Sequence, residues 1–127
     1  MHVILAVHDA QRSAEFYEGV FGWARNPLVA QWSNYVELFQ PEGGTLGLYE
    51  RDGFAAASGA ELPDPNGHEN PAELYVRVDD VRPLLERLEA AGARALSPLA
   101  PRVWGDDAAY FADPDGNVVA VAQYTSN

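Results

Sequence analysis

Two short stretches of the chain are alike, and both carry residues capable of chemistry. His2 opens the first stretch, which runs to Asp9, and Glu73 opens the second, which runs to Asp80. A histidine and a carboxylate can exchange protons, and both are ligands for divalent metal ions. Because each matched pair lies 71 residues apart, we expect a duplicated structure with its functional residues at equivalent places in the two halves.

Other candidate residues alternate along the same stretches. Glu73 and Arg77 fall on one strand face, where they could form an acidic and basic pair at a site or only a surface ion pair. Glu73 could be a catalytic general base near His2, or it could be hydrogen-bonded to His2 without turnover. Asp106 and its neighbour Asp107 suit either the mouth of a pocket or a solvated turn.

Amphipathic aromatic residues are numerous for a chain of this size. Their rings would suit a flat ligand by stacking or a cation through the ring quadrupole, although half or more of them could fill the core or a dimer interface instead. They are Trp32, Tyr35, Tyr49, Tyr75, Trp104 and Tyr110.

Hydrophobic spacing predicts the elements that position these residues. In the first half, Val3, Leu5 and Val7 alternate as the core side of a strand, and Asp9 can cap a helix that ends at Gly22. The second half repeats this order. Further strands are predicted at 24–30, 32–39 and 45–50, and the second half has a strand at 73–78, a helix from 81 to 92, and strands at 94–97, 108–112 and 118–123.

This order predicts an α+β fold in a single domain of residues 1–127. We expect two βαβββ modules, residues 1–50 and 72–127, whose paired sheets form a curved, mostly antiparallel cup with the helices outside. Residues 51–71 lack periodicity and are predicted to be a linker or a mobile flap over the pocket.

Composition excludes several classes of function. The chain has 8 basic and 19 acidic residues, and its net charge of −11 disfavours nucleic acid and anionic membranes as partners. It contains no cysteine, no apolar run of the roughly 20 residues that a membrane span needs, and no basic segment typical of a signal peptide, so we expect a cytoplasmic protein. Phosphate-loop and serine-hydrolase motifs are absent from the sequence.

Several short motifs carry a family resemblance. Val7-x-Asp9, Ser13, Phe16-Tyr17 and Phe21-Gly22 mark the first half, and Val78-Asp-Asp80, Gly92 and Phe111-x-Asp-Pro-Asp-Gly-Asn117 mark the second. With these motifs the chain resembles the vicinal oxygen chelate superfamily, which includes glyoxalase I, extradiol dioxygenases, fosfomycin resistance proteins and bleomycin-binding proteins. The resemblance extends from His2 to Gln123.

The resemblance implies up to four metal ligands, one from the first and one from the last strand of each half. His2 matches the first position, and Glu73 stands where a histidine is usual. The other two positions match Gly47 and Ala120, which have no ligating side chain. Because a catalytic divalent ion normally has three protein ligands, we expect no metal and no other cofactor. If a metal is bound, His2, Glu73 and Glu37 are the expected ligands.

We therefore predict a protein of this superfamily with a degenerate metal site that binds or sequesters a small aromatic or cationic organic molecule in the cup. The resemblance to bleomycin-binding proteins also implies a homodimer. The alternative is a lyase, isomerase or dioxygenase that uses an atypical metal site, or a metal-free acid and base, at His2 and Glu73. The predicted ligand-binding residues are His2, Trp32, Tyr35, Tyr49, Glu73, Tyr75, Arg77, Trp104 and Tyr110.

Overall fold

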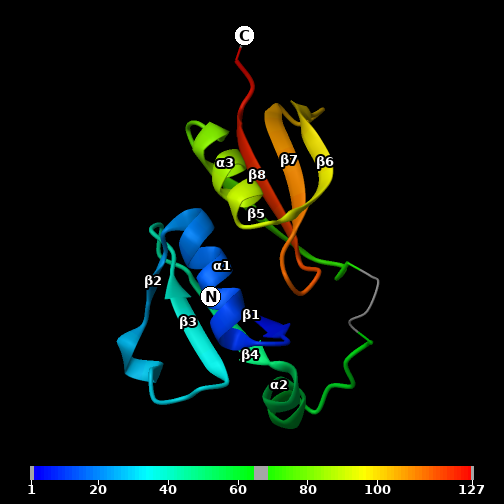
Figure 1. Cartoon of the computed structure of the whole chain (residues 1–127). Helices are drawn as coiled ribbons and strands as arrows, with labels where there is room; N and C mark the ends of the chain where they lie inside the picture. The colour runs from blue at the N-terminus through cyan, green and yellow to red at the C-terminus, as the bar shows by residue number, and fades with distance from the viewer. Residues whose placement is uncertain (1, 65–68, 127) are drawn as a thin grey trace. The chain divides into compact units, whose positions relative to one another are not determined.

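The chain divides into two compact units, residues 1–65 and 66–127, and each unit has its own four-stranded sheet. The computed structural model describes residues 2–64 and 69–126 (Figure 1). Within these residues no helix is long and apolar enough to cross a membrane.

The first unit consists of a mixed sheet and two α-helices. Its sheet has the order β1-β4-β3-β2, in which β1 runs parallel to β4 and the other pairs are antiparallel. The elements are β1 (His2–Val7), α1 (Ala10–Phe21), β2 (Ala24–Arg25), the 3-10 helix η1 (Pro27–Val29), β3 (Tyr35–Phe39), β4 (Thr45–Glu50) and α2 (Arg51–Ser58).

The second unit repeats this sheet. Its order is β5-β8-β7-β6, in which β5 runs parallel to β8 and the other pairs are antiparallel. The elements are β5 (Glu73–Arg77), α3 (Arg82–Ala90), β6 (Arg94–Pro101), β7 (Asp106–Ala112) and β8 (Val118–Tyr124). The predicted α+β fold with two βαβββ modules is confirmed.

The duplication extends to the way each first helix is held. The backbone N–H of Ala10, at the start of α1, donates to the Glu50 carboxylate at the end of β4, at 3.0 Å. In the second unit the N–H of Val81, at the start of α3, donates to Gln123 Oε1 on β8, also at 3.0 Å. The last strand of each unit therefore supplies a side chain to the otherwise unpaired donors of the helix that follows the first strand.

One face of each sheet carries the core. In the first unit α1 packs on β3 and β4, and a layer of apolar side chains is buried between the helix and the sheet. The opposite face of this sheet is not covered by α1. In the second unit Val119 and Val121 are buried on the same side of β8 as Gln123. The buried layer of the first unit comprises Val7, Tyr17, Val20, Val36, Leu38, Leu46 and Leu48.

Several predicted boundaries were wrong. The strand predicted at 24–30 ends at Arg25, because Pro27 opens η1 and the Asn26 side chain caps it at the N–H of Leu28. The next strand begins at Tyr35 instead of residue 32. In the second unit β6 continues to Pro101, and β7 begins two residues early.

The predicted linker or flap at 51–71 contains the helix α2, which starts directly after β4 and ends at Gly59, with φ 75°. Its short alanine-rich run has a helical preference that the lack of a longer periodicity concealed. Residues 59–64 and 69–72 form no regular element, and 65–68, including His68, lie outside the described residues. Val3, predicted to be in the core, is 38% exposed because β1 is an edge strand of its sheet.

Candidate functional site

The face of the first sheet that points away from α1 collects most of the candidate residues of that unit. Strand register sets the arrangement, because residues that pair across strands project to the same side. Gly47 of β4 is paired with Ile4 of β1 on one side and with Glu37 of β3 on the other. We call this side of the sheet the first open face; it carries His2, Ile4, Tyr35, Glu37, Thr45, Gly47 and Tyr49.

The position of Gly47 is closed by two neighbouring side chains. A Cβ atom at this residue would lie 2.6 Å from Tyr35 Oη and 2.9 Å from Ile4 Cγ1. Both distances are well inside ordinary van der Waals contact. Gly47 has no side chain, and the phenol of Tyr35 and the side chain of Ile4 take the space that one would occupy.

Glu37 is held as a carboxylate by two hydrogen bonds. The Asn26 side-chain amide donates to Oε1 at 3.0 Å, and the Tyr35 hydroxyl donates to Oε2 at 2.7 Å. The bond from Asn26 and then that from Tyr35 lower the pKa of Glu37, and the nearby His2 lowers it further. Burial and the same bond to Glu37 raise the pKa of Tyr35, so this phenol stays protonated at neutral pH. The pair suits ligand recognition better than proton transfer.

His2 and the aromatic rings complete the first open face. The His2 ring contacts the Thr45 hydroxyl through Nδ1, across the paired strands β1 and β4. The Tyr35 and Tyr49 rings meet edge to face at 5.5 Å between centroids, and Phe54 of α2 meets Tyr49 in the same way at 6.4 Å. Trp32 does not lie on this face; it is 53% exposed and lines a pocket beside η1.

The corresponding face of the second sheet carries the other predicted residues. Tyr75 is paired with Ala120 and Arg77 with Ala122, so the register places Ala120 on this face, where it offers no ligating atom. Tyr110 is paired with Ala120 from the other side, and the Arg102 guanidinium lies 5.2 Å from its ring centroid. We call this side of the sheet the second open face.

Arg77 does not form the pair with Glu73 that was considered for this strand face. Its Nη2 donates to Asp106 Oδ2 at 2.8 Å, and its guanidinium lies 4.8 Å from the ring centroid of Tyr124. The Tyr75 hydroxyl donates to the same carboxylate, and Trp104 Nε1 donates to the Tyr75 hydroxyl at 2.9 Å. Asp106 is only 1% exposed, so the solvated turn considered for it is wrong. The bonds from Arg77 and then from Tyr75 lower its pKa.

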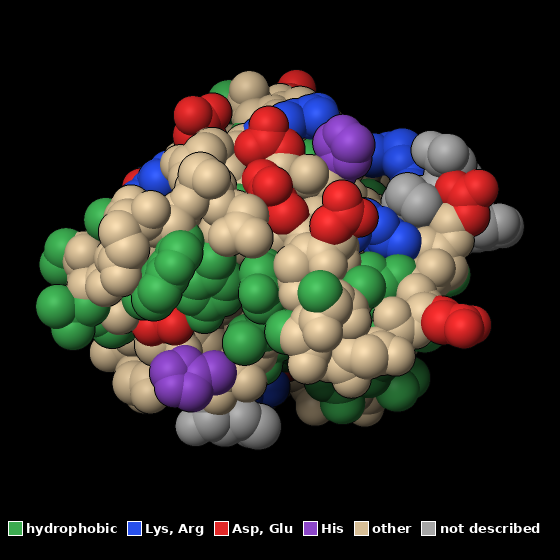
Figure 2. All heavy atoms as spheres, turned by 90° about the horizontal axis from the view of Figure 1, so that it is seen from below, with side chains coloured by type: hydrophobic (Ala, Val, Ile, Leu, Met, Phe, Trp, Pro, Cys, Tyr) green, Lys and Arg blue, Asp and Glu red, His purple; other side chains and the backbone are tan. Residues whose placement is uncertain are grey.

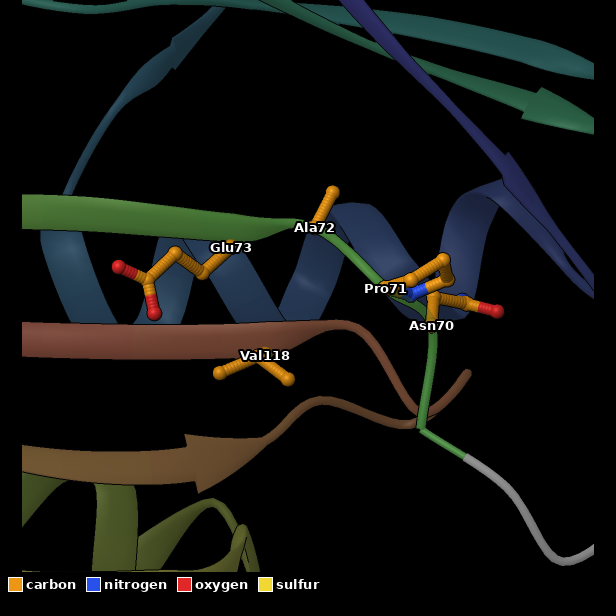
Figure 3. A pocket seen from close by; sticks show the side chains of 5 residues that line it. All are labelled: Asn70, Pro71, Ala72, Glu73 and Val118. Carbon is orange, nitrogen blue, oxygen red and sulfur yellow. The ribbon is translucent and has the colours of Figure 1, made fainter.

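Glu73 stands apart from this network. Within the described part of the chain its carboxylate makes no hydrogen bond or ion pair, and it lines a shallow pocket of about 350 Å³ with Asn70, Pro71 and Val118 (Figure 3). The Asn70 amide donates to Asn117 Oδ1 at 2.7 Å, which fixes the segment before β5 to the turn before β8. His2 belongs to the first unit and Glu73 to the second.

Neither open face by itself fits the divalent metal ion that the resemblance implies. The first offers His2 and Glu37, and both oxygens of Glu37 already accept hydrogen bonds. The second offers Glu73, which is paired with Val118, and Asp106, whose carboxylate already accepts hydrogen bonds from Arg77 and Tyr75. Across residues 2–64 and 69–126 no group of three or more His, Cys, Asp or Glu side chains is arranged to bind a metal. A structural or catalytic divalent site normally has three or four protein ligands.

Sequence comparison identifies the family. The model of the Glyoxalase/Bleomycin resistance protein/Dioxygenase superfamily matches residues 1–121, so the chain belongs to this family. An anthracycline biosynthesis protein, DnrV, from Streptomyces peucetius is 28% identical over 116 residues. That match covers 89% of this chain and 42% of DnrV, so the chain spans less than half the length of this relative.

Solved structures agree with this assignment. A glyoxalase-related enzyme from Fulvimarina pelagi is 28% identical with a TM-score of 0.81, and the match covers 96% of this chain and 85% of that one. A family enzyme from Burkholderia phytofirmans PsJN also has a TM-score of 0.81, at 19% identity, with 98% and 97% of the two chains covered. The second of these shows the fold alone.

Sequence reasoning missed Asn26, Arg102 and the importance of Asp106. Each acts on a candidate residue from a different strand or loop, and none has a motif that marks it. A signal was present only for Asp106, which follows a Trp-Gly turn next to a predicted strand. The pairing of that strand with β8 decides that the side chain points to the second open face.

Proposed function

We propose that this member of the glyoxalase and bleomycin resistance superfamily binds a small aromatic or cationic organic molecule on its open sheet faces, without a divalent metal ion. The observation that carries the proposal is the closure of Gly47 by Tyr35 and Ile4. The position that would supply a metal ligand in the family is here occupied by an aromatic side chain that holds a carboxylate.

The chemistry of the first open face supports this class of ligand. Glu37 keeps its negative charge well below neutral pH because two donors stabilise it. The rings of Tyr35 and Tyr49 stand on the same side of the sheet. A fixed anion beside aromatic rings attracts an organic cation by charge and through the ring quadrupole, and it binds a neutral flat molecule by stacking.

Two further observations agree with the proposal. The net charge of −11 favours a cation over an anion at long range, and acidic side chains gather beside a histidine on the face drawn in Figure 2. DnrV is named for the biosynthesis of anthracyclines. A ligand of related chemistry, with an aromatic ring system and an amino group, would match the first open face.

Metal content and ligand binding test the proposal together. Protein purified without chelator is analysed by plasma mass spectrometry, and its thermal unfolding is followed with a panel of aromatic amines. We expect substoichiometric metal and stabilisation by some of the amines. A ligand at about 100 times its Kd raises the free energy of unfolding by roughly 2.7 kcal/mol, a shift of several degrees in Tm for a domain of this size.

The role of Glu37 is tested with a matched pair of variants. Glu37→Gln removes the charge from the first open face, whereas Glu42→Gln removes the same charge from an exposed turn of the same unit. We expect Glu37→Gln to weaken the binding of an aromatic amine by about tenfold, which corresponds to roughly 1.4 kcal/mol. Glu42→Gln should leave it unchanged. Equal affinities of all three proteins would remove Glu37 from the site.

A metal-dependent lyase, isomerase or dioxygenase is the competing proposal. It requires one equivalent of a divalent ion that survives dialysis and is lost in both His2→Ala and Glu73→Ala. That result would overturn the metal-independent function. We also propose a homodimer by analogy with bleomycin-binding proteins, and light scattering of the purified chain measures this directly.

A further inference from the structure

We propose that a separate pocket of the first unit, enclosed by the start of α1, η1 and the start of β3, binds an uncharged, planar aromatic compound that carries a carbonyl group. The lining of this η1 pocket does not include Gly47, Ile4 or Glu37. Its ligand does not depend on the cation binding proposed for the first open face, although Tyr35 contributes to both.

The η1 pocket has the size and the walls of a small-molecule site. Its volume is about 350 Å³, within the range of roughly 300 to 1,000 Å³ that ligand pockets occupy. Apolar side chains form most of its wall, and only a few polar groups converge on it. It is lined by Gln11, Arg25, Asn26, Pro27, Val29, Ala30, Trp32, Tyr35 and Val36.

Local hydrogen bonds hold this wall in place. The Asn26 side chain accepts from the N–H of Leu28 at 3.0 Å, and the Asn26 N–H donates to the carbonyl of Glu37 at 2.8 Å. The N–H of Trp32 donates to the carbonyl of Val29 at 3.3 Å, which fixes the backbone that presents the indole. A wall fixed before binding costs little entropy when a ligand is bound.

Trp32 supplies the surface for an aromatic ring. It lines the pocket and is 53% exposed, whereas Trp23 of the same unit is buried in the core. Exposed indole at a concave site gains favourable contact when a flat ring stacks on it. Tyr35 and Val36, at the start of β3, also belong to the lining of this pocket.

The polar groups favour a neutral ligand with an acceptor. Among the described residues that line the pocket, Arg25 alone is charged, and its Nε and Nη2 donate to the Glu18 carboxylate at 3.1 and 2.9 Å. Arg25 Nη1 donates to Gln11 Oε1 at 2.6 Å, so the Gln11 amide nitrogen is left as a donor for which the described residues provide no acceptor. A carbonyl oxygen of the ligand can accept a hydrogen bond from this donor. The charges of Arg25 and Glu18 offset each other, so their ion pair has no net charge that would attract an ion.

Three naphthalenes that carry a neutral amide, a carboxylate or an ammonium group test the proposal. The probes are 1-naphthamide, 1-naphthoate and 1-naphthylmethylammonium, and their binding to the full chain is measured by calorimetry and by quenching of tryptophan fluorescence. We expect the neutral amide to bind with a Kd below about 1 mM. The anion should bind at least about tenfold more weakly. The proposal is abandoned if the amide shows no saturable binding, or if the anion binds as tightly.

Matched variants locate the bound amide. Trp32→Ala should weaken its binding by about tenfold or more, whereas Trp104→Ala, which removes a 55% exposed tryptophan from the second unit, should not. Ala30→Phe should block the η1 pocket by filling it. Equal binding by the wild type and Ala30→Phe would place the amide elsewhere and overturn the proposal.

The ammonium probe separates this proposal from the one for the first open face. If the ammonium probe binds through Glu37, Glu37→Gln should weaken its binding and Ala30→Phe should leave its binding unchanged. The amide should show the opposite dependence. Either site can therefore fail without the other, because each has its own probe and its own variant.

Discussion

Substitution of Gly47 by alanine gives the sharpest test of whether Tyr35 and Ile4 fill the space over this residue on the first open face. The new Cβ would meet Tyr35 Oη at 2.6 Å, Ile4 Cγ1 at 2.9 Å and Tyr35 Cε1 at 3.0 Å. All three atoms belong to side chains, so Tyr35 and Ile4 can move, but both side chains must shift at once to make room for the new Cβ. Overpacking of this kind costs about 1 to 3 kcal/mol. Because alanine has a smaller backbone entropy than glycine in the unfolded chain, the substitution also stabilises the fold by about 0.4 to 1 kcal/mol.

We therefore expect Gly47→Ala to lower the free energy of unfolding by about 1 to 2 kcal/mol, measured by urea denaturation. The same substitution in a Tyr35→Phe background should cost less, because the closest contact is with the hydroxyl that phenylalanine lacks. The difference between the two costs is the coupling energy of a double-mutant cycle, about 0.5 to 1 kcal/mol here.

Gly19→Ala is the matched control, because this glycine is exposed on α1 and a Cβ there meets no atom within 4 Å. It should raise the free energy of unfolding by about 0.5 to 1 kcal/mol. The reasoning fails if Gly47→Ala is neutral or stabilising, or if its cost is the same with and without the Tyr35 hydroxyl. In either case Tyr35 would not fill the space over Gly47.

Three further outcomes are expected. In an alkaline titration followed by phenolate absorbance, Tyr35→Phe should remove a phenol that ionises well above the ordinary range, because burial and the bond to Glu37 raise the pKa of Tyr35. The pKa of Glu37 is lowered, so its hydrogen bonds stabilise the fold at pH values above the ordinary glutamate pKa, and this contribution is lost as the pH falls. The difference in Tm between the wild type and Glu37→Gln should therefore be constant near neutral pH and shrink below about pH 4. Asp106→Asn should lower Tm and change the Trp104 emission, whereas Asp79→Asn, on an exposed residue of the same unit, should do neither.

Alternation and spacing determined much of the fold. The 71-residue repeat predicted two similar modules, and the structure has the same strand order in both. The period of two in β1 predicted that His2 lies on the side opposite Val7, and the register with β4 agrees. Asp9 caps α1 as predicted, with bonds from the N–H groups of Gln11 and Arg12. These features depend on neighbours in sequence, so the sequence alone contains them.

Contacts between distant residues were decided by tertiary structure. Arg77 and Asp106 lie 29 residues apart, and the pairing of both β5 and β7 with β8 brings the carboxylate beside the guanidinium. Periodicity states which face a residue occupies, but it does not state which side chain reaches it from a neighbouring strand. The helix α2 and the early end of β2 were likewise missed, because short elements have weak periodic signals.

The candidate site shows the same division. Gly47 and Ala120, which the family resemblance matched to ligand positions, have no ligating side chain in the sequence. Only the folded chain decided that Tyr35 fills the space over Gly47, that Asn26 and Tyr35 hold Glu37 as an anion, and that η1 encloses a pocket with Trp32. Absence of a side chain is a local property, whereas the atom that takes its place comes from another strand and depends on register and packing.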